Sequence, residues 1–408
     1  MKRGKVIKNL IFNEKYLLFI YLFVFTTPFY LWNAQYGVFS VILFISFLVK
    51  NKLSTFKGLS TFFFFKPLLL LLLFIAYTYL SLLWTENIEH GRWAQKVFRE
   101  ALIYIPLLFL SLSLSSAKNS LKLFALAFSI YALYSIGIYL GFYAIEGASQ
   151  NNPKGHLEFA ISTPMMSMGI LFSLVFVFYE KSRNIKIFFM CILLICSFAF
   201  LINNGRSAQL SLLLSLFTLV IFYLKEKLNY KFIFLGLTIF IIILVEVFNS
   251  SSRFQTGYKQ LNNAILNNDY SGSWGIRAYL YKTSFTILKE NPIFGVGAGD
   301  VRDEYRKIAK KEHTNEKYGS LHNSHFEFLL RYGIVGYALL VSSIFFLIRR
   351  LRFIPKYYYL AIAFYSTIFY NSFFNSLLDK KPIYIIFFMS FVFFSIIVLK
   401  SKETNIKV

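Results

Sequence analysis

One polar turn between two apolar runs carries an arginine next to a glycine. The turn covers residues 203–207 and places Arg206 directly after Gly205. Glycine lets backbone N–H groups come close to a ligand, and a guanidinium forms bidentate hydrogen bonds with phosphate oxygens. Arg206 is therefore a candidate phosphate-binding residue. An arginine that only anchors a helix end at a membrane surface would give the same pattern.

A glycine-rich segment follows a predicted helix further along the chain. Arg277 begins an apolar stretch that runs to Leu288, Pro292 then stops the helix, and glycines occupy every second position from 295 to 299. A Gly-x-Gly-x-Gly motif that follows a helix and not a strand does not fit a dinucleotide-binding loop. We interpret these glycines as a structural turn.

Two histidines stand just before another apolar run. His322 and His325 are three residues apart on an expected helix, so both could face one site. Histidine titrates near pH 7 and can act as a general base. The motif described below makes His322 the candidate base, and His325, one turn on, could orient it or contact the acceptor. Alternatively, His322 bonds to loop backbone and holds the loop against the other helices.

Metal binding is the weaker interpretation of this histidine pair. No cysteine and no Asp-x-Asp motif accompanies the two histidines. The nearby acids Asp300, Asp303 and Glu304 are expected to pair with Arg306 and Lys307, because their spacing fits one helix. We therefore expect no bound metal.

Apolar runs along the whole chain must position these residues. Of the 408 residues, 57% are hydrophobic and only 15% are charged, whereas soluble domains carry about 25% charged residues. Runs of this length and composition predict membrane spans. Twelve are expected, at residues 16–33, 36–49, 67–84, 101–115, 122–144, 161–179, 187–203, 208–224, 232–248, 333–348, 357–377 and 382–399.

The distribution of Lys and Arg predicts the orientation of these spans. With a cytoplasmic N-terminus, 24 of the 43 basic residues fall in cytoplasmic segments and 7 in short outer loops, among them Arg92, Lys96 and Arg99. Cytoplasmic loops are enriched in Lys and Arg, so both termini are expected in the cytoplasm. The net charge of +24 then reports topology, and no nucleic-acid partner is expected.

The predicted fold is an all-α polytopic membrane protein with helices in one large outer loop. It divides into spans 1–9 (residues 1–248), the loop (249–332) and spans 10–12 with a cytoplasmic tail (333–408). The basic N-terminus lacks a small-residue cleavage site, which predicts a retained first helix. Because the spans contain almost no ionisable residues, an ion-coupled transporter is not favoured.

These motifs, in this order and topology, resemble the O-antigen ligase and O-antigen polymerase superfamily of bacterial membrane glycosyltransferases, and most closely the ligases. The resemblance runs from about residue 188 to 345. It is carried by Arg206 in the polar turn, by Arg277 with the segment 291–299, and by His322-Asn323 before the segment 332–336.

The resemblance implies a fold similar to GT-C glycosyltransferases and a glycan donor on undecaprenyl diphosphate. The glycan would move to the lipid A-core oligosaccharide at the periplasmic face of the bacterial inner membrane. Arg206 and Arg277 would hold the diphosphate, and His322 would deprotonate the acceptor. ATP is not expected, because the diphosphate is already an activated leaving group. A metal cofactor is not expected either, because arginines can neutralise the diphosphate and the sequence has no acidic metal-binding motif. The reaction is expected to invert the anomeric carbon.

Four further residues are assigned supporting roles by their place in these motifs. Gly205 and Asn323 adjoin the candidate residues, and His325 lies one turn beyond the candidate base. Asp379, in the last outer loop, resembles an acidic residue that some ligases have there.

Three other functions remain open on the sequence alone. A polymerase of the same superfamily adds glycan to lipid-linked glycan, and a protein O-oligosaccharyltransferase attaches it to protein, although such enzymes tend to be longer. A lipid-linked glycan flippase would have charges that line a cavity within its spans, and this chain has few.

Overall fold

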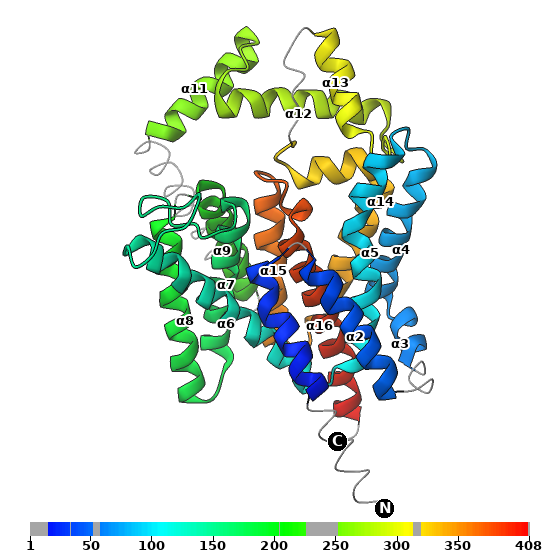
Figure 1. Cartoon of the computed structure of the whole chain (residues 1–408), viewed down its shortest axis with the longest axis vertical. Coiled ribbons are helices and arrows are strands. Elements are labelled where there is room, and N and C mark those ends of the chain that lie inside the picture. Colours follow the sequence, from blue (N-terminus) through cyan, green and yellow to red (C-terminus); the bar gives the residue numbers. More distant parts are fainter. Residues whose placement is uncertain are drawn as a thin grey trace, which may run out of the picture.

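A computed structural model of the chain describes residues 15–32, 34–51, 58–203, 205–225, 252–312 and 320–406. In these ranges the chain forms helices and two isolated β-bridges (Figure 1). After a helix at residues 15–26 come η1 (Thr27–Phe29), α2 (Gln35–Asn51), α3 (Leu59–Phe64), α4 (Lys66–Leu80), η3 (Ser81–Leu83), α5 (Ile88–Ser111), α6 (Leu114–Tyr139), α7 (Phe159–Tyr179), α8 (Arg183–Ile202), α9 (Arg206–Lys225), α11 (Ser252–Asn267), α12 (Gly272–Glu290), α13 (Val301–Lys311), α14 (Ser324–Leu351), α15 (Pro355–Ser372), η4 (Leu377–Asp379) and α16 (Lys381–Ile406).

The chain is a multi-pass membrane protein. Seven helical segments in the described residues are long and apolar enough to cross a bilayer: Lys66–Leu83, Leu114–Tyr139, Phe159–Tyr179, Arg183–Ile202, Ser207–Leu224, Ser324–Leu351 and Lys381–Ser401. Two shorter apolar helices cover Lys15–Phe29 and Gln35–Val49. The expected all-α membrane fold is confirmed, whereas the number of twelve spans stays a prediction. The expected span at 232–248 lies outside the described residues.

Three helices, α5, α6 and α14, begin well before the apolar runs that predicted them, and two of these extensions concern residues named above. α5 starts at Ile88, so Arg92, Lys96 and Arg99 lie on this helix and not in a short loop. α14 starts at Ser324, nine residues before the expected span. In both cases polar residues extend a helix beyond its apolar part, and hydropathy alone does not detect that extension.

α16 forms the centre of the helix bundle. Within its apolar segment, 94% of the residues are buried inside the protein. α5 and α6 pack against it together with η1, and Phe98 and Phe124 of these helices meet Phe388 and Phe393 of α16. The buried helix is therefore apolar on all sides, as expected for a helix without a lipid or solvent face.

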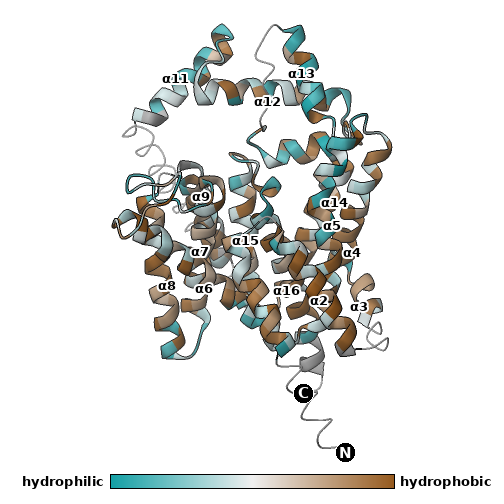
Figure 2. Ribbon diagram, in the orientation of Figure 1, coloured by the Kyte–Doolittle hydropathy of each residue, from teal (hydrophilic) through white to brown (hydrophobic). Residues whose placement is uncertain are grey.

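α11, α12 and α13 lie across one end of the bundle, here called the loop end (Figure 1). These helices are more hydrophilic than the bundle (Figure 2). α12 and α13 share a small apolar core that includes Tyr279, Ile287 and Tyr305. The start of the helix at residue 15 and the end of α16 lie at the opposite end of the bundle. The helix expected at 277–288 is confirmed as α12, and the helix expected to carry Asp303, Glu304, Arg306 and Lys307 is confirmed as α13.

A break at Gly333 divides α14 into a short polar part and a long apolar part. Gly333 has φ 60° and ψ −170°, which interrupts the helical ladder. In a regular helix the N–H groups of Ile334 and Val335 would donate to the carbonyls of Leu330 and Arg331. These four groups need other partners, because an unpaired backbone group at membrane depth is costly.

The glycine-rich segment after α12 supplies those partners. Ile334 and Val335 donate to the carbonyls of Pro292 and Ile293 at 2.9 and 3.2 Å. In return, the carbonyls of Leu330 and Arg331 accept from the N–H groups of Val296 and Gly297, at 2.8 and 3.2 Å. The backbones approach so closely that a Cβ at position 295 would lie 2.5 Å from the Leu330 carbonyl oxygen. The interpretation of the glycines as a structural turn is therefore confirmed.

Substituting Gly333 with alanine should destabilise the protein more than the same change at Gly147. Both glycines have positive φ, which costs an L-residue about 1–2 kcal/mol. A Cβ at 333 would also lie 2.1 Å from the Ile293 carbonyl oxygen, whereas nothing lies within 4 Å of one at 147. Thermal unfolding in detergent measures the difference, and equal shifts in Tm would contradict the assigned role of the break.

Candidate active site

His322 lies at the loop end in a non-helical segment just before α14. Its φ of 52° is in the left-handed region, which costs a non-glycine residue about 1–2 kcal/mol. The backbone N–H donates to Ser320 Oγ at 3.1 Å, and the residue is exposed. The expectation that His322 and His325 share a helix is wrong, because the N-cap of α14 is Asn323 and the chain turns at His322.

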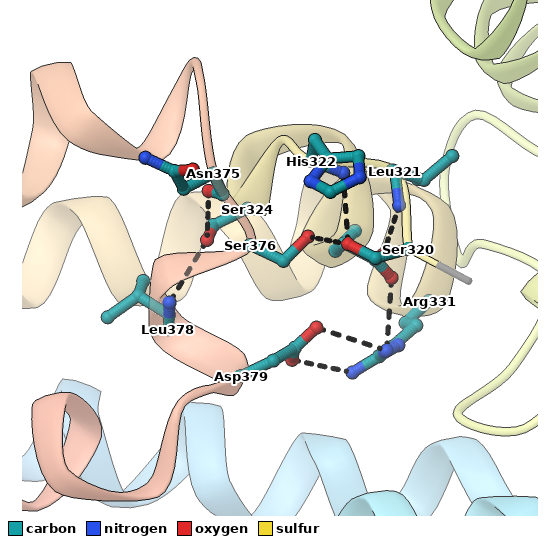
Figure 3. A network of polar contacts seen from close by, with 10 residues as sticks. Ser320, Leu321, His322, Ser324, Arg331, Asn375, Ser376, Leu378 and Asp379 are labelled. Carbon is teal, nitrogen blue, oxygen red and sulfur yellow. Dashed lines mark hydrogen bonds and ion pairs between the residues drawn. The ribbon is translucent and has the colours of Figure 1, made fainter. Parts of the chain in front are cut away.

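The loop between α15 and α16 holds the His322 segment on one side (Figure 3). Ser376 Oγ and Ser320 Oγ share a hydrogen bond of 2.7 Å. The carbonyl of Asn375 accepts from both N–H and Oγ of Ser324, each at 3.2 Å. Leu378 N–H then donates to Ser324 Oγ at 3.0 Å. The backbone is thus fixed on both sides of His322.

Asn323 has a structural role that accounts for its place in the motif. It is buried, and its side-chain oxygen accepts from Phe326 N–H at 3.1 Å, which caps the first turn of α14. Asn323 also lies beside Tyr281 on α12, the helix that carries Arg277. The Tyr281 hydroxyl donates to the carbonyl of Phe373 at 2.7 Å.

Arg277 lies close enough to His322 to affect its charge state. Arg277 is half-buried and forms no ion pair with any residue that the structure describes. The ring of His322 is partly desolvated although the residue is exposed, and this desolvation lowers the pKa of His322 below its ordinary value. The positive charges of Arg277 and Lys380 lower the pKa further. His322 is therefore neutral at pH 7, the form in which an imidazole accepts a proton.

The start of α9 reaches the same site through Asn375. Ser207, next to Arg206, accepts a hydrogen bond from Asn375 Nδ2 at 2.9 Å, and the carbonyl of Asn375 is bonded to Ser324. Arg206 is the first residue of α9, but its side chain lies outside the described residues. The three sequence motifs thus meet at the loop end of the bundle.

Gly205 packs closely against α7. A Cβ at this position would lie 2.6 Å from Thr163 Cγ2, so the glycine lets the start of α9 approach its neighbour. This packing accounts for the glycine without a ligand. The prediction that Gly205 helps to bind phosphate stays untested.

Both ring nitrogens of His325 are occupied within the protein. Nε2 bonds to the carbonyl of Phe369 at 2.9 Å, and Nδ1 bonds to the hydroxyl of Tyr337 at 2.8 Å. A carbonyl only accepts, so Nε2 carries the proton and Nδ1 accepts from Tyr337. The ring also packs against Phe369 and Phe373, with centroids 4.9 and 4.3 Å away. These contacts favour a structural role over contact with a substrate.

Asp379 belongs to a charged network that the sequence analysis missed. Its two oxygens lie 3.1 and 3.5 Å from the guanidinium of Arg331 (Figure 3). Arg331 also pairs with Glu327 at 3.0 Å. The second oxygen of Glu327 accepts from Leu321 N–H at 3.1 Å. Glu327 and Arg331 are four residues apart on α14, a spacing that could have predicted their ion pair.

The acidic residues at the start of α13 hold the large loop against the bundle. Asp300 accepts from the backbone N–H groups of Glu86 and Asn87, both at 2.8 Å. Asp303 accepts from the side chain of Asn87 at 2.7 Å. The expected pair of Glu304 with Lys307 is confirmed at 2.6 Å, whereas the expected basic partner of Asp300 is replaced by these backbone groups. Within the described ranges, no three His, Cys, Asp or Glu side chains come together as metal ligands.

Comparison with known proteins supports the motif-based resemblance. Residues 191–341 match the family described as O-Antigen ligase, and this range includes Arg206, Arg277 and His322. An uncharacterized protein of Haemophilus influenzae is 24% identical over 271 residues. That alignment covers 62% of this chain and 65% of the relative, which is just under two thirds of the relative's length.

Loss of the Arg277 charge should raise the pKa of His322. The positive charge disfavours imidazolium, so Arg277→Gln is expected to stabilise the protonated form. Carbethoxylation of neutral histidine, followed across pH by mass spectrometry, measures the midpoint, which we expect below 6.5 in the wild type and higher in Arg277→Gln. Lys186→Gln at the opposite end is the control. The same midpoint in all three proteins would contradict this electrostatic coupling.

Proposed function

We propose that this chain, which belongs to the O-antigen ligase superfamily through its residues 191–341, transfers a glycan from undecaprenyl diphosphate to the lipid A-core oligosaccharide. The observation that carries the proposal is the pairing of an unneutralised Arg277 with a neutral His322 at the loop end. Arg277 lies on α12 and His322 in the segment just before α14, and both belong to the range that matches the family.

The loop end faces the periplasm, and the protein lies in the bacterial inner membrane. The excess of Lys and Arg in the other segments supports this orientation, with both termini in the cytoplasm. The separation of α11–α13 from the end of α16 fits it as well (Figure 1). The glycan donor and acceptor would then be reached from the periplasmic leaflet.

The arginines bind the diphosphate of the donor. Arg277 has no carboxylate partner among the described residues, so its charge is available to an anionic ligand. A guanidinium can bind two phosphate oxygens and stabilise the negative charge that grows as the bond to the glycan breaks. Arg206 contributes a second guanidinium from the start of α9. The site needs no metal ion in this mechanism.

His322 accepts the proton of the acceptor hydroxyl. The hydroxyl oxygen attacks the anomeric carbon as the bond to the diphosphate oxygen breaks, and the electron pair of that bond leaves with the diphosphate. Because attack comes from the face opposite the leaving group, the anomeric configuration inverts. Undecaprenyl diphosphate is released, and the proton on His322 passes to solvent before the next turnover.

A polymerase of the same superfamily is the alternative that uses the same residues. The two reactions differ only in the acceptor, which is a lipid-linked glycan for the polymerase. Genetics separates them: loss of a ligase leaves complete core without O-antigen, whereas loss of a polymerase leaves core with one repeat unit.

Labelling of single cysteines should report opposite sides of the membrane at Ser271 and Ser182. The background is Cys191→Ser and Cys196→Ser, and both target positions are exposed. We expect a membrane-impermeant maleimide to label Ser271→Cys in cells with a permeable outer membrane, and Ser182→Cys only after lysis. The reverse pattern would contradict the proposed orientation.

Lipopolysaccharide from a deletion strain tests the proposed reaction. We expect the O-antigen ladder to disappear with the core intact, and to return with the wild-type gene but not with His322→Ala, because loss of a general base costs about 10²–10⁴-fold in rate. Arg277→Lys should also fail, since a point charge does not replace a planar fork. Full ladders from His322→Ala at normal protein levels would contradict the assigned base.

A further inference from the structure

The structure assigns a positioning role to Glu327, which acts on His322 through the backbone of Leu321. This inference rests on the proposed function, in which His322 is the base. The carboxylate of Glu327 accepts the N–H of Leu321, the residue directly before His322. Arg331 and Asp379 hold Glu327 in place from the far side.

The two N–H groups that precede the Cα of His322 are both bonded. Leu321 N–H donates to Glu327 Oε1 at 3.1 Å, and His322 N–H donates to Ser320 Oγ at 3.1 Å. These bonds hold the two consecutive peptide groups before the Cα of His322, and so the position from which its side chain extends. A left-handed φ at a non-glycine residue persists only where its surroundings determine it in this way.

A carboxylate at position 327 needs compensation, because its side chain is only 2% exposed. Arg331, with 17% of its side chain exposed, provides it through one guanidinium nitrogen and bonds Asp379 as well. Asp379 belongs to the segment that also carries Ser376, which bonds Ser320. The network thus joins both supports of the His322 segment: α14 on one side and the loop before α16 on the other (Figure 3).

A purely structural role for Glu327 would also use these contacts. In that case the ion pairs of Arg331 with Glu327 and Asp379 only anchor η4 to α14. Loss of these ion pairs would then lower Tm, donor binding and turnover together. A positioning role makes a narrower claim: removing Glu327 slows turnover because His322 is displaced. The effect must then disappear in a protein that already lacks His322, since mutations that act through one group are not additive.

The experiment compares Glu327→Ala with Glu327→Gln in purified protein, each with and without His322→Ala. The matched control is Glu180→Ala, which removes a carboxylate bonded to Lys122 and Lys356 at the opposite end, at 2.9 and 2.5 Å. Turnover, KM for the lipid-diphosphate donor, donor binding and Tm are measured for each variant.

We expect Glu327→Ala to lose about 10-fold to 10²-fold in kcat with donor binding unchanged, because small displacements of a catalytic group have effects of this size. Glu327→Gln keeps an acceptor for Leu321 N–H and should lose less. In the His322→Ala background neither change should lower the residual rate further. Glu180→Ala should lower Tm without lowering kcat.

Three results would overturn the inference: unchanged kcat in a folded Glu327→Ala protein, a further loss in the His322→Ala background, or an equal loss of kcat in Glu180→Ala. Where Glu327→Ala does not fold, the same comparisons are made with Glu327→Gln and Asp379→Asn. Wild-type turnover in His322→Ala would instead contradict the proposed function. Failure of the positioning role of Glu327 and failure of the proposed function therefore give different results.

Discussion

The break in α14 at Gly333 is the constraint on which the candidate site depends. A membrane helix that stops its hydrogen-bond ladder leaves donors and acceptors that lipid cannot satisfy. Here the segment at 292–297 supplies two carbonyls and two N–H groups to the break, in four backbone hydrogen bonds. The break therefore separates the apolar part of α14 from its polar first turns and, together with the bonds of Asp300 and Asp303, attaches the large loop to the bundle.

The position of His322 follows from this arrangement. The polar part of α14 begins at its N-cap Asn323, one residue after His322, and the loop at 375–379 fixes the segment from the other side. The same loop bonds Ser207 at the start of α9. Hydrogen bonds thus connect α9, the loop at 375–379 and the start of α14, which are far apart in the sequence, next to His322.

Two arginines near His322 differ in whether carboxylates of the protein compensate their positive charge. Arg331 lies between the carboxylates of Glu327 and Asp379, so its charge is compensated within the protein. Arg277 forms no ion pair with a described residue and lowers the pKa of His322 instead. The ion pairs of Arg331 hold Glu327, which accepts the N–H of Leu321. Arg277 instead keeps an uncompensated positive charge near the neutral imidazole of His322. This difference is why we assign structure to Arg331 and ligand binding to Arg277.

Sequence patterns predicted the membrane helices, α12, α13 and the glycine turn, because apolar runs and glycine spacing are local signals. They did not predict the polar first turns of α5 and α14, which carry no apolar signal. The contacts of His325 with Phe369 and Tyr337, and those of Asp379 with Arg331, join separate helices and depend on packing that no local pattern records. The motif residues were found by type and spacing, but their neighbours required the fold.

A structure of the protein bound to undecaprenyl diphosphate would test the central claim most directly. The account predicts the diphosphate at the loop end, with its oxygens within hydrogen-bond distance of the Arg277 and Arg206 guanidinium groups and with His322 facing the position of the glycan. A diphosphate bound at the opposite end of the bundle, or one held at the loop end without contact to Arg277, would contradict it.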